Sequence, residues 1–380
     1  MAARTRSVLP ALHPELTDLL LAALAEEGLP TDAVALAQGV AELSAAYNAA
    51  AFPVRWTPAR EAGRVAFFLP RDARKIEAAL RDLPLAALGR PALRVLDLGA
   101  GVGGSGLGAV LGLRGRGYSG EIALTLVEPE PRALTRGVAL LRRCVDGLGL
   151  GPVTVQGLRG DLRAGPGEFD LVVLGAVLVE VGHGQAEAAR VELLRQLLRG
   201  ILAQNVGGDG LLLVVEPALK VTSRRLQQVR EALRGEAGLF VVAPCPHAEA
   251  CPLLTRAEDW CHEDLAVDLP AALVPIARAA GLRWQGLTYS RLALSTSPVR
   301  RPGARVVLPP HPTKGKLAQG LCLPGSPSVV VVERLDRHAS AENEAWSTLS
   351  RGDGLDLPGA SWEGRPARIG PEQRVLPFRP

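Results

Sequence analysis

Glycines and one carboxylate gather in the stretch Leu93–Gly104, which reads L-R-V-L-D-L-G-A-G-V-G-G. Its apolar part predicts a buried parallel strand over Val95–Leu98, and its glycines let the backbone turn tightly against a ligand before a helix begins. Asp97 lies two residues before the first glycine, where it would repel the pyrophosphate of a dinucleotide. A ligand with an ammonium and a sulfonium suits this carboxylate, so the pattern favours S-adenosylmethionine (SAM) over a nicotinamide cofactor. The cofactor-binding residues expected here are Asp97, Gly99, Gly101 and Gly103.

Two further carboxylates follow predicted strands. Glu128 comes directly after the strand predicted over Glu121–Val127, and we expect it to bind the ribose hydroxyls of the adenosyl group. Asp161 follows a short strand predicted at Val153–Val155, where it is a candidate acceptor for the adenine amino group. An Asp after a Gly also commonly forms a turn, so this second assignment has a purely local alternative.

Three of the five cysteines, Cys245, Cys251 and Cys261, are crowded into one short segment. An odd number of cysteines with this crowding indicates metal ligation rather than a disulfide framework. Cys322 is the expected fourth metal ligand, which leaves Cys144 as an ordinary buried residue of a helix.

Four thiolates suit either zinc or an iron–sulfur cluster, and their spacing does not decide between the two. Prolines follow Cys245 and Cys251 directly, as in the rigid turns around cluster cysteines. His247 and His262 keep a mixed Cys/His zinc site open, although the preferred interpretation is that His247 caps a turn and that His262 forms a local hydrogen bond.

Strands and helices alternate from Arg94 onward. Beyond the strands named above, the pattern predicts strands at Phe169–Leu174 and Leu211–Val215, and helices at Leu134–Leu148 and Arg190–Ala203. This alternation predicts an α/β fold with a parallel, doubly wound sheet of the SAM-methyltransferase type, whose ligand lies at the carboxyl ends of the strands.

The segments that flank this sheet are predicted as follows. Helical periodicity marks Thr31 to Ala50, with Thr31-Asp32 as its start signal, and Asp72–Leu83. Gly281–Thr296 has the pattern of a strand that closes the sheet. The expected division is an N-terminal helical region (1–91), a SAM-binding domain (92–243), a Cys-rich metal-binding insertion leading to a small β segment (244–335) and a disordered tail (336–380).

The net charge of +4 and the pI near 9.0 are only mildly basic. A basic stretch stands out near the last cysteine; it contains Arg300, Arg301, Arg305, Lys314 and Lys316. These residues could neutralise RNA phosphates or balance the negative charge of a thiolate-bound cluster, and the sequence leaves both interpretations open.

No apolar run reaches the ~18 residues that a membrane-spanning helix needs. Met1–Leu9 is basic, but neither an apolar core nor a small-residue cleavage site follows it. The sequence therefore predicts a cytoplasmic protein without a membrane contact, and we expect a monomer.

Several blocks together resemble one family. These blocks are V-L-D-L-G-A-G-V-G-G, V-V-E-P, A-P-C-P-H-A-E-A-C-P-L, D-W-C-H, Y-S-R-L-A-L and K-G-K…C, between Trp56 and Arg334. The chain is in this respect similar to the small-ribosomal-subunit methyltransferase-like family, whose mitochondrial members are assembly factors of that subunit. The resemblance implies a SAM-methyltransferase fold bound to small-subunit ribosomal RNA. It also implies a [4Fe–4S] cluster, whose ligands fall by motif on Cys245, Cys251, Cys261 and Cys322.

The sequence departs from methyltransferase patterns at two turns. After Glu216-Pro217 the family has a Gly-Thr-Pro-like turn, whereas this chain has Ala218-Leu219-Lys220. After the fourth predicted strand it has Gly175-Ala176-Val177-Leu178, which contains neither a base-methylation tetrad nor a cysteine nucleophile. No catalytic residue can be named. The two main hypotheses are an RNA-directed SAM-dependent methyltransferase and a non-catalytic assembly factor that docks on RNA, and a third, less favoured one is a nicotinamide oxidoreductase with an electron-transfer cluster.

Overall fold

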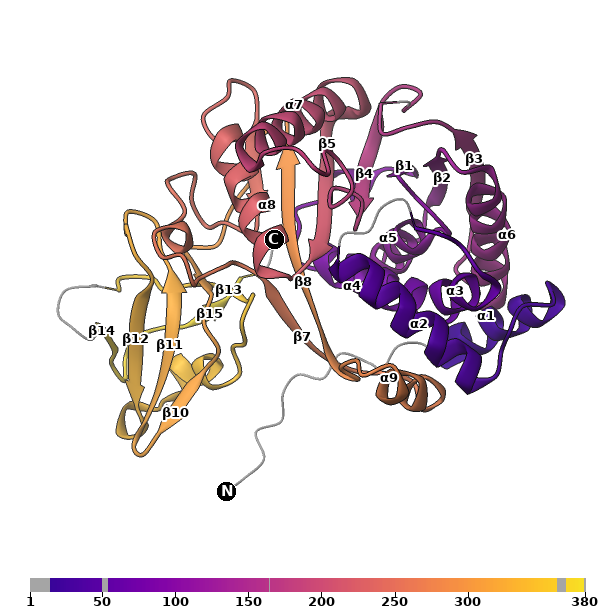
Figure 1. Cartoon of the computed structure of the whole chain (residues 1–380). Coiled ribbons are helices and arrows are strands. Elements are labelled where there is room, and N and C mark those ends of the chain that lie inside the picture. Colours follow the sequence, from indigo (N-terminus) through magenta and orange to yellow (C-terminus); the bar gives the residue numbers. More distant parts are fainter. Residues whose placement is uncertain (1–13, 50–53, 164, 361–366, 379–380) are drawn as a thin grey trace.

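The computed structural model describes residues 14–49, 54–163, 165–360 and 367–378, and these ranges form two sheets, shown in Figure 1. An eight-stranded sheet is complete before residue 296, and a seven-stranded sheet follows it. The basic segment Met1–Leu9 lies outside the described residues.

The eight-stranded sheet has the order β3-β2-β1-β4-β5-β8-β6, and β7 also pairs with β8. Its parallel strands are β1 (Ala92–Leu98), β2 (Glu121–Glu128), β3 (Val153–Arg159), β4 (Phe169–Gly175) and β5 (Val206–Pro217). The antiparallel members are β6 (Phe240–Ala243), β7 (Glu263–Asp268) and β8 (Gln285–Ser295). This order confirms the doubly wound α/β fold and the closing strand. Because the chain reverses direction across the sheet between β3 and β4, the carboxyl ends of β1 and β4 flank the switch point where such sheets bind ligands.

Helices cover both faces of this sheet. One apolar core includes residues of α5 (Gly104–Gly115) and α6 (Pro131–Gly147), together with the N-terminal helices. A second core lies against α7 (Glu187–Asn205) and α8 (Lys220–Leu233). The sheet is therefore buried on both sides, which explains why its central strands read as continuous apolar runs.

The N-terminal helical region contains α1 (Pro14–Glu26), α2 (Ala33–Asn48), α3 (Pro58–Gly63), the π-helix η1 (Arg64–Phe68) and α4 (Leu69–Leu80). Asp32 caps α2 as its start signal predicts, since its Oδ1 accepts a hydrogen bond of 2.9 Å from the Ala35 amide. Helix α4 packs closely on α5, because Gly104, Gly108 and Gly112 bring the backbones of the two helices together. This contact brings η1, which directly precedes α4, close to the start of α5.

The seven-stranded sheet has the order β14-β12-β11-β9-β13-β15, and β10 pairs with β11. Its strands are β9 (Ala304–Val306), β10 (His311–Thr313), β11 (Lys316–Cys322), β12 (Val330–Leu335), β13 (Gly354–Asp356), β14 (Ala367–Ile369) and β15 (Leu376–Pro377). The short helical segments elsewhere are η2 (Ala86–Gly89), η3 (Pro252–Leu254), η4 (Ala271–Leu273), α9 (Val274–Ala279), η5 (Asp336–His338) and η6 (Ala341–Ser347).

The prediction that residues 336–380 form a disordered tail is wrong for the residues of this range that the structure describes. Trp346 is fully buried in the core of the second sheet, where its Nε1 donates to the Leu317 carbonyl at 3.2 Å. The strands β13, β14 and β15 also come from this tail. The prediction failed because these apolar residues follow no regular period along the chain, although they meet in one core. Residues 361–366 and 379–380 of the predicted tail lie outside the described residues.

Candidate functional site

The glycine loop, residues 99–103, connects β1 to α5 at the carboxyl end of β1. The amides of Gly99 and Ala100 donate to the Val127 carbonyl at the end of β2, at 2.9 and 3.0 Å. Gly103 takes the left-handed conformation, with a φ of 89°, and α5 begins directly after it. The loop therefore lies between the ends of two neighbouring strands and the start of a helix.

Asp97 is fully buried below this loop. Its Oδ2 accepts a hydrogen bond of 2.7 Å from the Gly106 amide in the first turn of α5, whereas Oδ1 has no hydrogen-bond partner among the described residues. Burial raises the pKa of this carboxyl to about 7; the Gly106 bond opposes the rise and the charge of Glu128 adds to it. A buried carboxylate oxygen without a donor suits a cationic ligand, because a positive charge would compensate its lost hydration.

Glu128 is the last residue of β2, and its carboxylate binds a backbone amide of the glycine loop. Its Oε2 accepts from the Gly101 amide at 2.8 Å, and its Oε1 accepts from the Glu130 amide at 3.1 Å. The structure thus brings Asp97, Gly99, Gly101 and Glu128 together at one edge of the sheet.

Two other residues predicted to bind the cofactor have local structural roles. A Cβ at Gly103 would collide with Cδ1 of Leu141 in α6, so this glycine permits close helix packing. Asp161 is exposed, and its Oδ1 accepts from the Arg163 amide at 2.8 Å, as in a turn. Their predicted contacts with a cofactor stay predictions.

A buried carboxylate at the end of β5 anchors the loop after β4. Glu216, at the end of β5, is buried, and its Oε1 accepts from the Leu178 amide at 2.9 Å. Burial raises its pKa to about 7, although bonds from the amides of Leu178, Val177 and Val179 oppose the rise. The Val177 side chain approaches the Cα of Gly99 so closely that a Cβ there would collide with it. This loop therefore brings an apolar side chain to the glycine loop.

Sequence reasoning missed two residues beside the glycine loop. A Cβ at Gly101 would collide with Nη2 of Arg64, so this guanidinium covers the loop. Arg64 comes from η1, and its guanidinium carbon lies 4.8 Å from the centre of the Trp56 ring. No local motif identifies either residue, because only the packing of α4 on α5 brings them to the loop.

We expect the affinity for SAM to fall as the pH drops below about 7. The ionised form of Asp97 attracts the cationic ligand, and its raised pKa means that this form is lost between pH 8 and 6. The affinity should then decrease by up to about tenfold per pH unit below the pKa. Calorimetric titration of Asp97→Asn should show a weaker but flat profile, whereas the exposed Asp161→Asn should keep the slope of the unchanged protein. A slope that survives in Asp97→Asn would exclude this carboxyl as its origin.

The four cysteines predicted to bind metal approach one another from separate segments. Cys245 follows β6, Cys251 precedes η3, Cys261 precedes β7 and Cys322 ends β11. Three of them, Cys251, Cys261 and Cys322, pack into one small cluster with Leu253 and Val307. Burial raises the pKa of Cys322, and the charges of the other three thiols raise it further, so all four sulfurs lie within electrostatic range of one another. Cys144 is buried in α6 as predicted.

Hydrogen-bond donors approach three of these sulfurs. Arg305 Nη1 donates to the Cys261 Sγ at 3.0 Å, and Gln227 Nε2 donates to the Cys251 Sγ at 3.2 Å. His247 Nε2 lies 3.1 Å from the Cys322 Sγ. The side chain of His247 therefore contacts a predicted metal ligand instead of capping a turn. Burial raises the pKa of Cys245, and the nearby Arg230 opposes that rise. Burial thus raises the pKa of Cys245, Cys251 and Cys322, and the neighbouring donors and cations oppose the rise only in part.

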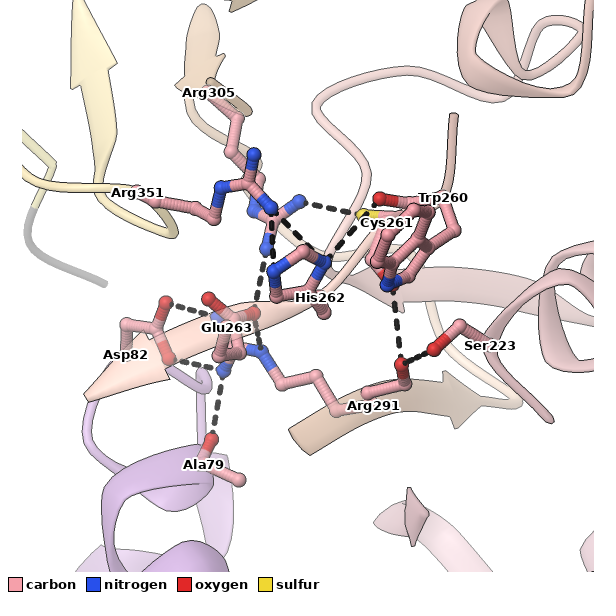
Figure 2. A network of polar contacts seen from close by, with 11 residues as sticks. Ala79, Asp82, Ser223, Trp260, Cys261, His262, Glu263, Arg291, Arg305 and Arg351 are labelled. Carbon is pink, nitrogen blue, oxygen red and sulfur yellow. Dashed lines mark hydrogen bonds and ion pairs between the residues drawn. The ribbon is translucent and has the colours of Figure 1, made fainter. Parts of the chain in front are cut away.

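A buried ionic network connects this thiol region to the N-terminal helices, as Figure 2 shows. Glu263 Oε1 accepts from Arg305 Nη2 at 2.6 Å and from Arg291 Nε at 2.8 Å. Arg291 also donates to Asp82 Oδ2 at 2.7 Å and to the Ala79 carbonyl at 2.9 Å.

His262 lies beside this network. Its ring stacks on Trp260 at 5.5 Å between centroids, and its Nδ1 lies 2.9 Å from Arg351 Nη1. Burial and the charge of Arg351 lower its pKa to about 4, so the ring is neutral near pH 7.

Three residues of the basic stretch contact acidic partners, and one of these three, Arg305, is buried. Arg305 is buried between Glu263 and Cys261, Lys316 pairs with Glu333, and Arg300 Nη2 lies 2.6 Å from Asp356 Oδ2. These contacts favour the charge-balancing interpretation for Arg305 over a continuous surface for RNA phosphates.

The metal itself stays a prediction. Within the ranges that the structure describes, no group of three or more His, Cys, Asp or Glu side chains has an arrangement that would hold a metal ion. The four thiols nevertheless have the chemistry of a soft-metal donor set and lie near the cationic Arg230 and Arg305.

Several solved structures that resemble this chain at low sequence identity are methyltransferases. Magnesium protoporphyrin IX methyltransferase from Synechocystis PCC 6803, with bound SAM, has a TM-score of 0.34 and 13% identity over 61% of this chain and 85% of its own. A TehB-like SAM-dependent methyltransferase from Corynebacterium glutamicum has a TM-score of 0.30 and 16% identity over 60% and 87%. Because these TM-scores and identities are low, the assignment of the fold depends on the strand order of this chain, which is that of a methyltransferase-type α/β sheet. No curated protein sequence matches the chain.

No helix among the described residues is long and apolar enough to cross a membrane. The predicted cytoplasmic location stays a prediction, because the matching family is described as mitochondrial.

One family model matches residues 155–346, half of the chain, and is described as mitochondrial small ribosomal subunit Rsm22. The matched range begins within β3 and includes all four clustered cysteines as well as β7, β8 and most of the second sheet. It agrees with the resemblance seen in the sequence blocks, and with the class of protein expected from them. The chain belongs to the Rsm22 family.

Proposed function

We propose that this protein binds SAM at the glycine loop and acts on the small ribosomal subunit or its RNA as a methyltransferase-type factor. The observation that carries the SAM site is Asp97: it is buried beside the loop, bonded through one oxygen to α5 and without a donor on the other. Glu128 secures the same loop through the Gly101 amide. Bound SAM would supply an electrophilic methyl group, and the chain would orient it toward an acceptor.

The ribosomal partner is inferred from the family. The description of the matching model names the mitochondrial small ribosomal subunit. The arginine-rich composition is compatible with an RNA partner, since arginine forms bidentate contacts with phosphates. A monomeric state and the compartment of the protein remain parts of the proposal, and cell fractionation would test the latter.

One observation favours a second candidate function, a non-catalytic assembly factor. The loop after β4 contains Ala176, Val177 and Leu178, and its nearby carboxylate Glu216 is bonded to backbone amides. Val177 turns an apolar side chain to the glycine loop. These three apolar side chains supply neither a nucleophile nor a base beside the glycine loop, so in this second candidate SAM would stabilise the docking fold rather than react.

Methyl-labelled SAM and purified small subunits distinguish the two candidates. The subunits are taken from cells that lack the protein, so any acceptor is unmodified. Incorporation of label that Asp97→Asn abolishes would support the enzyme. Subunit binding that requires SAM but gives no incorporation would support the assembly factor, and absence of any SAM or subunit binding would contradict both.

We further propose that Cys245, Cys251, Cys261 and Cys322 hold an iron–sulfur cluster. The mutual electrostatic influence of the four thiols supports a shared site. A single zinc with bonds of about 2.3 Å requires sulfurs about 3.8 Å apart, whereas a cubane is held by thiolates spread over a wider volume. The cluster would join the segment after β6 to β11 of the second sheet, and Arg305 would compensate part of its negative charge.

A spectrum of the anaerobically purified chain tests this assignment. A broad band near about 400 nm with matching iron and acid-labile sulfide would support the cluster. A colourless protein that contains one zinc would contradict it.

A further inference from the structure

The π-helix η1 brings a basic side chain to the SAM site proposed above. This segment, Arg64–Phe68, separates α3 from α4, and the Leu69 amide bonds back to the Arg64 carbonyl. Short π segments inside α-helices occur frequently at functional sites, because the extra residue redirects one side chain. Arg64 is the first residue of this π-helix, and its guanidinium lies beside the glycine loop.

Arg64 occupies the space directly over Gly101. A Cβ at Gly101 would meet Nη2 of Arg64, and the φ of Gly101 is positive at 55°. The flat face of the guanidinium rests on Trp56 at 4.8 Å, which orients the group without using its N–H donors. Among the described residues, no carboxylate lies within ion-pair distance of Arg64. The donors are therefore available to an anionic ligand.

The charges around Arg64 match the amino-acid end of SAM. Burial raises the pKa of Glu180, and the neighbouring Arg64 and Glu128 act on it with opposite signs, so these three charges share one region. Asp97 adds another carboxylate within range of Glu128. SAM carries a sulfonium, an ammonium and a carboxylate. The acidic residues suit its two cations, and Arg64 is the cation placed to receive the carboxylate in a bidentate pair.

We infer that Arg64, oriented by Trp56, binds the carboxylate of the methionine part of SAM and thereby selects SAM and its demethylated product over adenosyl compounds without that group. The inference rests on the proposed SAM site. It assigns a role to the N-terminal helical region that lies outside the range matched by the family model.

Titration calorimetry of the full chain with two ligands tests this role. SAM and decarboxylated SAM share the adenosyl group, the sulfonium and the amine, and they differ only in the carboxylate. The unchanged protein should bind SAM about ten- to a hundredfold more tightly, the range for a hydrogen bond to a charged group. Arg64→Gln should lose this preference by weakening SAM alone, and Arg64→Lys should retain part of it. Arg55→Gln removes an exposed arginine that directly precedes Trp56 and should change neither affinity.

Equal binding of both ligands by the unchanged protein would overturn the role of Arg64 while leaving the SAM site in place. So would an Arg64→Gln variant that keeps the preference, or one that weakens both ligands equally. Absence of binding of either ligand to the unchanged protein would instead contradict the SAM site itself. If Arg64→Gln does not fold, the ligand comparison on the unchanged protein and on Arg64→Lys still decides the question.

Discussion

The Glu263→Gln variant is expected to lose about 3 to 5 kcal/mol of unfolding free energy, the cost of removing one partner from a buried ion pair. The side chain of Glu263 is 8% exposed, and those of Arg291 and Arg305 are each 4% exposed. Its Oε1 accepts from both guanidinium groups, so the neutral amide leaves two buried cations with less compensation (Figure 2). Urea unfolding followed by circular dichroism measures the loss.

Asp264→Asn provides the matched control one residue along the same strand. Asp264 Oδ1 lies 3.4 Å from Arg283 Nη2, but the two side chains are 41% and 54% exposed. Solvent screens such a pair, so the expected loss is below about 1 kcal/mol. A Glu263→Gln variant as stable as this control would contradict the view that the network holds the second sheet, β7 and α4 together.

The parallel sheet could be predicted from the sequence because its signals are local. Val95–Leu98 and Phe169–Leu174 are apolar runs, and both lie within observed strands. The predicted ends of other strands were less accurate. Strand β3 continues to Arg159 through largely exposed residues, and β5 begins at Val206 with a glycine-rich stretch that weakens any strand pattern. Register with neighbouring strands sets these limits, and the sequence does not display it.

The second sheet and its tail could not be predicted from periodicity. Its core combines Val306 and Leu321 with Trp346 and Leu355, which come from separate short segments. None of these segments buries enough surface to be stable alone, so the order arises only when they assemble. A composition rich in Gly, Pro and charge therefore suggested disorder where a compact sheet forms.

The residues of the candidate sites also differ in how well the sequence could predict them. Asp97, Gly101 and Glu128 belong to a motif whose spacing encodes its geometry, and the structure brings them together. Arg64 reaches the same loop only through packing between helices, so no spacing identifies it. Arg305 looked like part of a basic surface, but it bonds to Glu263 and Cys261 across element boundaries. Charge along a sequence does not distinguish a solvated residue from a buried, paired one.

The Cys251→Ser variant is expected to lose nearly all of its iron, from about four atoms per chain for a [4Fe–4S] cluster, together with the visible absorbance. Serine removes one of the four expected thiolate ligands. Without the cluster, the segment after β6 and strand β11 would no longer be linked to each other through a shared metal site. The variant should unfold at a lower temperature, because metal binding contributes directly to folding. Iron analysis and thermal unfolding under anaerobic conditions measure both effects.

Cys144→Ser is the control for Cys251→Ser, since it makes the same atomic change at a buried cysteine in α6, away from the other four. Burial raises the pKa of the Cys144 thiol to about 12, and its charged neighbour is Arg143, whereas the pKa of Cys251 is also raised by the charges of Cys261 and Cys245. This control should keep its iron while losing some stability from the buried hydroxyl. Iron at the unchanged level in Cys251→Ser would contradict the ligand assignment. Equal loss of iron in both variants would show that the metal depends on general folding rather than on Cys251, because a thiol in α6 has no route to the cluster except through the stability of the whole fold.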